Sequence, residues 1–151
     1  MSKHDNNVEI KNNRLPQWRK AEACYFVTWR LDLGSGRLNG PERDLVCRAI
    51  EYFHGERYKL RAYVVMDNHV HIVLVMLAGN DLSDQLKSIK RYTAIHINRM
   101  RGRSGKLWQK ASYTRILFDN SAVASCSEYV MSNPQRRWHG ISEYKWMKQF
   151  D

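Results

Sequence analysis

The feature that most constrains the fold is an apolar run interrupted by two histidines, MDNHVHIVLVML, at residues 66–77. Side chains two apart along a strand project from the same face, so His69 and His71 are expected to point together. Val70 and Ile72 then face the opposite way and are apolar enough to lie under helices. Asp67-Asn68 before them predicts a tight turn that follows another strand. The stretch therefore predicts two adjacent strands with both imidazoles on one face.

The rest of the chain alternates strands and helices. Clustered aromatic and β-branched residues predict strands at 24–32 and 113–118. Helical spacing of apolar residues predicts helices at 41–58 and 81–101, the second with Ser83 as N-cap and Ile95 on or near its buried side. A last helix is expected from 119–121 to Asn133-Pro134, with a tail at 135–151 that packs on the domain.

This order predicts an α+β, ferredoxin-like fold. Its split β-α-β arrangement has two helices on one face of an antiparallel sheet, with an added C-terminal helix. Residues 1–14 are expected to be mobile, and 15–151 to form a single domain.

The charge balance indicates a polyanionic partner. Lys and Arg number 25 against 15 Asp and Glu, a formal net charge of +10, and nucleic acid is the commonest partner of so basic a domain. Cys24, Cys47 and Cys126 form no C-x-x-C pair, which predicts free thiols and a cytoplasmic location. No stretch approaches the ~18 consecutive apolar residues of a membrane span, so membrane anchoring is not expected.

Two neutral imidazoles on one strand face can chelate a divalent cation if a third ligand and open positions are supplied. The alternative is that His69 and His71 are unrelated polar residues, hydrogen-bonded locally at a strand end. Two other histidine-rich enzyme classes fit less well. Hydrolases of the histidine-triad type need a third alternating histidine, where this chain has Val73, and two-histidine phosphoesterases need a second H-x-Ser/Thr, which is absent.

The last predicted helix carries a second set of chemically useful residues. Val123, Cys126 and Val130 are spaced as a buried stripe, and Tyr129 and Asn133 stack one turn apart beside it. An amide oxygen suits a hard metal ion, and a phenol becomes a nucleophile once deprotonated. The simpler interpretation is an amphipathic edge tyrosine and a helix-terminal asparagine before proline.

Basic residues cluster along the long helix and the loop after it. Phosphate-neutralising cations with an aromatic side chain for base stacking suit single-stranded DNA, although each cation taken alone is better explained as solvated surface. The candidate DNA-binding residues are Lys87, Lys90, Arg91, Arg99, Arg101, Arg103, Lys106, Trp108, Lys110, Arg136 and Arg137.

These motifs together resemble the single-strand DNA tyrosine transposases of the histidine-hydrophobic-histidine endonuclease superfamily. More narrowly, the chain is similar to transposases associated with repetitive extragenic palindromes (REP sequences). The resemblance runs through LPQWR, YFVTWRL, YVVMDNHVHIVL, IKRYTAIHINR, GKLWQKASYTR and EYVMSNP.

The resemblance implies a role for each site residue. His69 and His71 match the pair that holds Mg²⁺ or Mn²⁺, and Asn133 matches the usual third ligand, where many relatives carry Gln or Glu. Tyr129 matches the nucleophile that forms a 5′-phosphotyrosine intermediate; Tyr92, Tyr113 and Tyr144 are rival tyrosines. The neutral Asn133 predicts a weaker metal site than glutamate would give.

The resemblance therefore predicts a metal-dependent endonuclease and strand transferase acting on REP-type hairpin DNA as a monomer. Two other functions remain open: a catalytically silent nucleic-acid-binding module on the same fold, and a metal-dependent phosphohydrolase that uses water.

Overall fold

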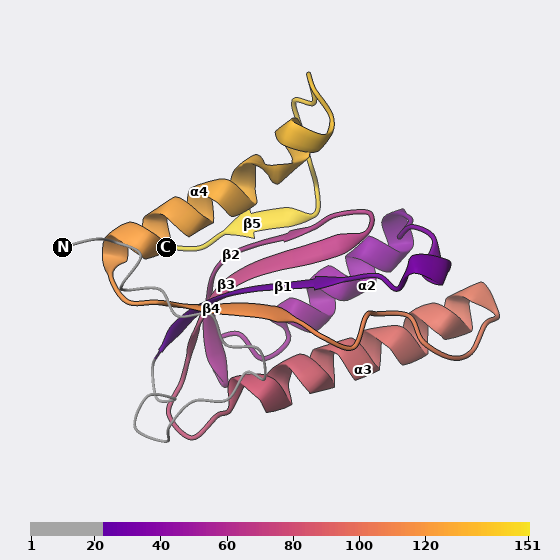
Figure 1. The fold of residues 1–151 in the computed structure, drawn as a ribbon, viewed down its shortest axis with the longest axis horizontal. Helices are drawn as coiled ribbons and strands as arrows, with labels where there is room; N and C mark the ends of the chain where they lie inside the picture. Colours follow the sequence, from indigo (N-terminus) through magenta and orange to yellow (C-terminus); the bar gives the residue numbers. More distant parts are fainter. Residues whose placement is uncertain (1–22) are drawn as a thin grey trace.

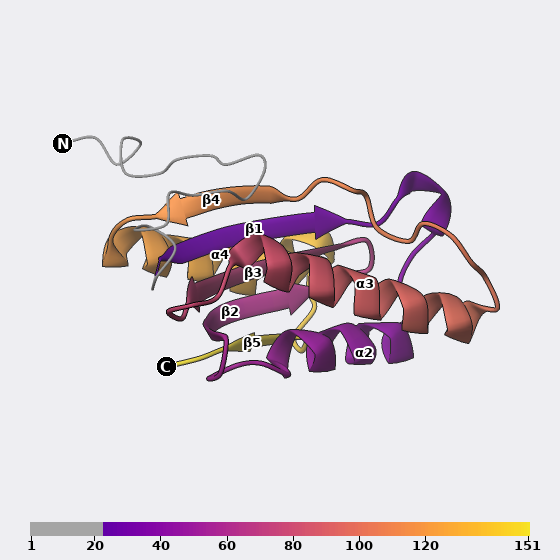
Figure 2. The ribbon, with the colours of Figure 1, turned by 90° about the horizontal axis from the view of Figure 1, so that it is seen from below.

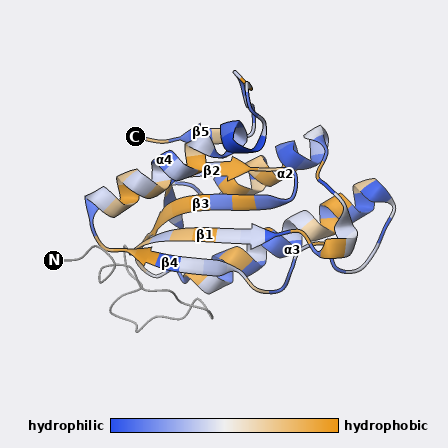
Figure 3. Ribbon diagram, turned by 45° about the horizontal axis from the view of Figure 1, so that its top comes forward, coloured by the Kyte–Doolittle hydropathy of each residue, from blue (hydrophilic) through white to orange (hydrophobic). Residues whose placement is uncertain are grey.

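A computed structural model describes residues 23–151, and the expected mobile segment 1–14 lies outside them. Its centre is a five-stranded antiparallel sheet in the order β4-β1-β3-β2-β5 (Figure 1). The strands are β1 (Cys24–Arg30), β2 (Tyr58–Val65), β3 (His69–Met76), β4 (Tyr113–Leu117) and β5 (Met147–Gln149). β3 lies in the middle because it is apolar on both faces, and Figure 3 shows that only its start is hydrophilic. The predicted ferredoxin-like arrangement is confirmed.

Two helices cover one face of the sheet (Figure 2). α2 (Gly40–Glu51) begins at a capping box between Asn39 and Glu42, and α3 (Leu82–Arg101) follows β3. They enclose the larger core, to which β3 contributes Val70 and Ile72, predicted to lie under the helices, together with Leu74. A single-turn 3-10 helix, η2 (Leu33–Ser35), lies between β1 and α2 in the chain.

Three local predictions on this face are wrong. The first helix ends at Glu51 rather than at residue 58, because Gly55 turns the chain with φ +87° and Tyr58 already begins β2. Asp81, not Ser83, caps α3, since its side chain accepts from the backbone N–H of Asp84. Ile95 is 46% exposed instead of buried.

α4 (Asn120–Arg137) lies on the opposite face of the sheet, over a smaller core (Figure 1). Cys126 and Val130 are buried there as predicted, and Val123 packs against them. The helix does not end at Pro134, as the sequence predicts, but continues for three more residues. Proline removes one backbone donor. Side chains on both sides of Pro134 support this part of the helix, since the Tyr129 carbonyl accepts from Ser132, Asn133 and Arg136.

The C-terminal tail packs on the domain as expected, and it adds a strand that sequence patterning missed. β5 pairs with β2, with Ala62 opposite Gln149 and Val64 opposite Met147. A three-residue strand of Met, Lys and Gln has no alternation to detect. Within residues 23–151, no helix is both long enough and apolar enough to span a membrane.

Candidate active site

The two histidines share one face of β3, the face that α4 covers. Their ring centroids are 4.7 Å apart, and His69 and His71 are 8% and 5% exposed. Val70 and Ile72 on the other face belong to the core under α2 and α3. The alternation in the sequence therefore brings both imidazoles to the same place.

Each imidazole is fixed through its Nδ1 atom. Thr28 Oγ1 on the neighbouring strand lies 2.6 Å from His71 Nδ1, and Asn68 Oδ1 lies 2.7 Å from His69 Nδ1. Phe26 stacks on the His71 ring at 5.5 Å. These contacts set the orientation of both rings and leave the Nε2 atoms as the positions at which a metal ion could be bound.

Burial keeps both imidazoles neutral. Burial, together with the nearby Arg30 guanidinium, lowers the pKa of His69 to about 4. Burial, the neighbouring His69 and Arg30 lower the pKa of His71 to about 3. At neutral pH each ring therefore has the lone pair that coordination requires.

α4 brings the tyrosine and the asparagine to the same place. The Tyr129 ring lies 5.5 Å from that of His71 and is 46% exposed, so its phenol can meet a large substrate. Asn133 is only 9% exposed, its amide N–H donates to the Tyr129 carbonyl, and its side chain is close enough to His69 to raise the pKa of that imidazole. The structure thus gathers His69, His71, Tyr129 and Asn133 from two elements distant in sequence.

The rival tyrosines are placed differently. Tyr92 lies on α3, across the sheet from the histidines, and the Tyr144 hydroxyl donates to the Val65 carbonyl. Tyr113 is 39% exposed on β4, where its ring lies 6.2 Å from Phe26. Tyr129 is the tyrosine whose ring directly contacts that of a histidine in the pair.

The donor set suits a hard divalent cation with open positions. Two imidazoles and one amide oxygen are available from His69, His71 and Asn133. Among residues 23–151, no three His, Cys, Asp or Glu side chains cluster as a metal site. These residue types fit Mg²⁺ or Mn²⁺, and a neutral amide in place of a carboxylate predicts weak binding.

Sequence reasoning missed several residues around the histidines. Phe26, Thr28 and Arg30 alternate on β1, and the register places Thr28 opposite His71 and Arg30 opposite His69. The alternation in YFVTWR predicts that these three side chains share a face. The sequence contains no comparable pattern that predicts which residues of β3 they are paired with. Asp67, which the sequence indicates only as a turn residue, is 7% exposed and binds two arginines.

Three of the candidate DNA-binding residues serve the fold instead. Trp108 is 5% exposed and its indole N–H donates to Thr93, so the prediction that it stacks on bases is wrong. Arg101 forms a buried ion pair with Glu42 at 2.7 Å. The Lys90 ammonium donates to the carbonyls of Gln109 and Lys110, which commits it to the loop.

The other basic candidates are exposed and lie on α3, on the loop after it and at the end of α4, where Arg137 also pairs with Asp67. Lys87 and Arg91 lie on α3, across the sheet from the histidines. The loop after α3 passes the end of β1 (Figure 2), where the Gln109 N–H donates to the Arg30 carbonyl. The remaining exposed candidates are Arg99, Arg103, Lys106, Lys110, Arg136 and Arg137.

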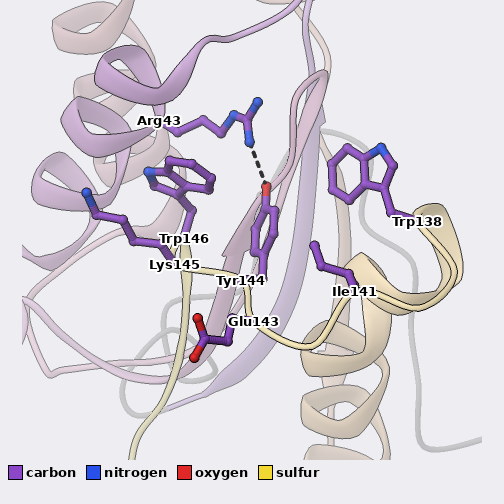
Figure 4. Close-up of a pocket in the computed structure, with 7 residues that line it drawn as sticks. All are labelled: Arg43, Trp138, Ile141, Glu143, Tyr144, Lys145 and Trp146. Atoms are coloured by element: carbon purple, nitrogen blue, oxygen red, sulfur yellow. Dashed lines mark hydrogen bonds between the residues drawn. The ribbon is translucent and has the colours of Figure 1, made fainter.

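A pocket of about 670 Å³ lies beside the C-terminal tail rather than at the histidines (Figure 4). Its aromatic lining holds the tail in place: the Trp146 indole donates to Asp44, and Arg43 donates to the Tyr144 hydroxyl. Both contacts join the tail to α2.

The comparison with protein families gives one match over most of the chain. The family described as transposase, IS200 like, matches residues 42–133, which contain both histidines, Tyr129 and Asn133. No curated protein matches significantly.

Two solved structures have a similar fold. One, described as the REP-associated tyrosine transposase bound to a REP hairpin, has a TM-score of 0.64 and 19% identity, covering 87% of this chain and 72% of that chain. The other, a protein from Deinococcus radiodurans R1 described as a transposase, has a TM-score of 0.51 and 18% identity, covering 74% and 90%. At these identities the likeness is one of fold.

Proposed function

The chain belongs to the IS200-like transposase family, and on that premise we propose that it nicks and rejoins single-stranded DNA through a covalent bond to Tyr129. The observation that carries the proposal is the 5.5 Å approach of the Tyr129 ring to His71. A half-exposed phenol beside two buried, neutral imidazoles is the arrangement that a tyrosine nucleophile and its metal site require.

The reaction exchanges one phosphodiester bond for another. Tyr129 loses its phenolic proton to solvent, and its Oη atom attacks the phosphorus. The Oη–P bond forms as the P–O3′ bond breaks, and the 3′ oxygen takes up a proton. The products are a 5′-phosphotyrosine and a free 3′-hydroxyl. Because the intermediate keeps a phosphodiester bond, attack by a 3′-hydroxyl reverses the step without ATP.

His69, His71 and Asn133 are the residues proposed to hold Mg²⁺ or Mn²⁺. When bound, such an ion polarises the scissile phosphate and stabilises the charge that develops on it. Thr28 and Asn68 keep the two rings oriented for this task through their hydrogen bonds to Nδ1.

The proposed substrate is DNA that is single-stranded at the nick and folded into a REP-type hairpin next to it. The fold shared with a transposase bound to a REP hairpin supports this choice. The exposed cations on the loop after α3 and at the end of α4 are the proposed phosphate contacts. We propose that the protein acts as a monomer.

The test is covalent trapping. Purified protein is incubated with labelled hairpin oligonucleotides and Mg²⁺ or Mn²⁺ and is then analysed on denaturing gels. We expect an adduct that EDTA prevents and that Tyr129→Phe abolishes. Tyr113→Phe, which removes an exposed hydroxyl from the same face of the sheet, is the matched control and should keep the adduct.

Other results would point elsewhere. Cleavage without an adduct that survives in Tyr129→Phe would show hydrolysis by water. Hairpin binding with no cleavage across the panel would indicate a silent binding module.

A further inference from the structure

Arg30 extends from rigid backbone beside the histidine pair. It ends β1, shares a face with Phe26 and Thr28, and is paired in register with His69. Its carbonyl accepts from Gln109 N–H, and the next residue, Leu31, donates to the Asn68 carbonyl. The backbone is therefore fixed on both sides, while the side chain is exposed.

Arg30 lies beside the histidine pair. It is opposite His69 in the β1–β3 ladder, two residues along β1 from Thr28, which is opposite His71. Arg136 approaches the same site from α4, with its guanidinium 4.2 Å from the centre of the Tyr129 ring. Two cations thus border the histidines, one from the neighbouring strand and one from the helix.

Nearby carboxylates do not neutralise Arg30. Asp67 is taken by Arg37 at 2.7 Å and Arg137 at 2.8 Å, and Asp32 lies 3.6 Å from Lys106. Within residues 23–151, Arg30 has no carboxylate within ion-pairing distance. An arginine on a fixed backbone, with no carboxylate partner among residues 23–151 and next to two neutral imidazoles, is suited to receive an anion from outside.

We infer that Arg30 binds a non-bridging oxygen of the scissile phosphodiester. This inference rests on the proposed function and adds the group that recognises the reacting phosphate. A guanidinium presents a planar pair of donors that matches phosphate oxygens, and it remains charged throughout the reaction. Held on β1 while Tyr129 comes from α4, it opposes the charge that builds up as the phenol attacks.

The experiment measures the rate of adduct formation for four proteins: wild type, Arg30→Gln, Arg30→Lys and Arg48→Gln. Arg48 is exposed on α2, across the sheet, so its replacement removes the same charge away from the site. Each protein is assayed on two oligonucleotides. One carries the natural phosphate at the nick, and the other an uncharged methylphosphonate there.

On the natural phosphate, Arg30→Gln should slow the reaction by about 100-fold or more. Arg30→Lys should recover part of the lost rate, because lysine restores the positive charge but not the planar pair of donors. Arg48→Gln should stay within about twofold of wild type, and thermal midpoints should be unchanged because Arg30 is exposed. Replacing the natural phosphate with the methylphosphonate should slow wild type much more than it slows Arg30→Gln. The variant has no guanidinium at position 30, so it loses nothing when the negative charge of the phosphate is removed.

Two failures are distinguishable. If wild type forms no adduct on any oligonucleotide, the proposed function falls and this inference with it. If wild type forms the adduct and Arg30→Gln matches its rate, or if the methylphosphonate slows both proteins equally, only the inference about Arg30 is overturned.

Discussion

The two faces of the sheet use polar residues in opposite ways. Under α2 and α3, polar groups are paired inside the protein: Arg101 with Glu42, and the Trp108 indole with Thr93. On the α4 face, the Tyr129 ring is half-exposed and Arg30 lacks a carboxylate partner among the described residues. The first face is built for stability, whereas the second leaves chemical groups available for a substrate.

This difference follows from how each face is covered. Two helices enclose a large core on one side, whereas α4 alone packs over a smaller core on the other. Substitutions on the first face should therefore reduce the free energy of unfolding, and those on the second should reduce activity.

The largest effect on stability is expected from Trp108→Ala. Trp108 is buried and packs edge-on against Trp29 with ring centroids 6.0 Å apart, so its removal leaves a large cavity. We expect a loss of about 3–5 kcal/mol in the free energy of unfolding, measured by urea denaturation. Tyr129→Phe should change the free energy of unfolding by less than about 0.5 kcal/mol. Equal destabilisation by the two substitutions would contradict the division between faces.

The next effect is the loss of the buried ion pair through Arg101→Met. It would leave Glu42, 2% exposed, without its partner, at a cost of about 3 kcal/mol in unfolding free energy. Chemical denaturation at pH 7 measures this loss. The double variant Glu42→Gln/Arg101→Met should recover part of it, because no unpaired charge then remains. No recovery would mean that Arg101 acts mainly through the Ser35 and Arg37 carbonyls that it also contacts.

The same pair predicts how stability depends on pH. Burial alone would raise the pKa of Glu42, but hydrogen bonds from Arg101 and the Asn39 N–H outweigh it and hold the pKa below its ordinary 4.5. The stabilisation is therefore present above pH 4.5 and is lost as pH falls through the lower folded-state pKa. Glu42→Gln should flatten this acid dependence of the urea midpoint. The exposed Glu128→Gln should not, and an unchanged profile in Glu42→Gln would refute the assignment.

On the other face, Thr28→Val should affect activity more than stability. The replacement keeps the shape but removes the hydroxyl that lies 2.6 Å from His71 Nδ1 and orients the ring. Loss of such a supporting hydrogen bond lowers metal affinity or activity by about 10–100-fold. Titration with Mn²⁺, followed by adduct formation, measures the shift in metal dependence. Thr28→Ser retains the hydroxyl and should stay close to wild type; a loss as large as that of valine would indicate packing.

Much of this architecture could be predicted from periodicity alone. The alternation at residues 69–76 predicts the shared face of His69 and His71, and helical spacing predicts the buried Cys126 and Val130 beside Tyr129. Both patterns are local. The contacts that complete the site are not, because the pairing of Thr28 with His71 depends on strand register, which one sequence does not reveal.

The same limit explains the errors among the basic residues. Composition shows how many cations a segment carries but not which of them are engaged inside the protein. Arg101 contacts Glu42 across 59 positions of sequence, and Lys90 contacts loop carbonyls. Trp108 belongs to a basic loop in the sequence, although its bridge to Leu31 carries it into the core.

The smallest expected effect separates the remaining cations by face. Arg103 and Lys106 lie on the loop that reaches the end of β1, whereas Lys87 and Arg91 lie on α3, across the sheet from the histidines. We expect Arg103→Gln/Lys106→Gln to weaken binding of a single-stranded hairpin at low salt. The slope of log affinity against log salt should fall by roughly 0.7 for each phosphate that the protein no longer neutralises. Lys87→Gln/Arg91→Gln removes the same charge and should change the slope less. If the α3 pair changes it more, DNA runs over the helical face, and the assignment of substrate contacts to the α4 face would have to be extended across the sheet.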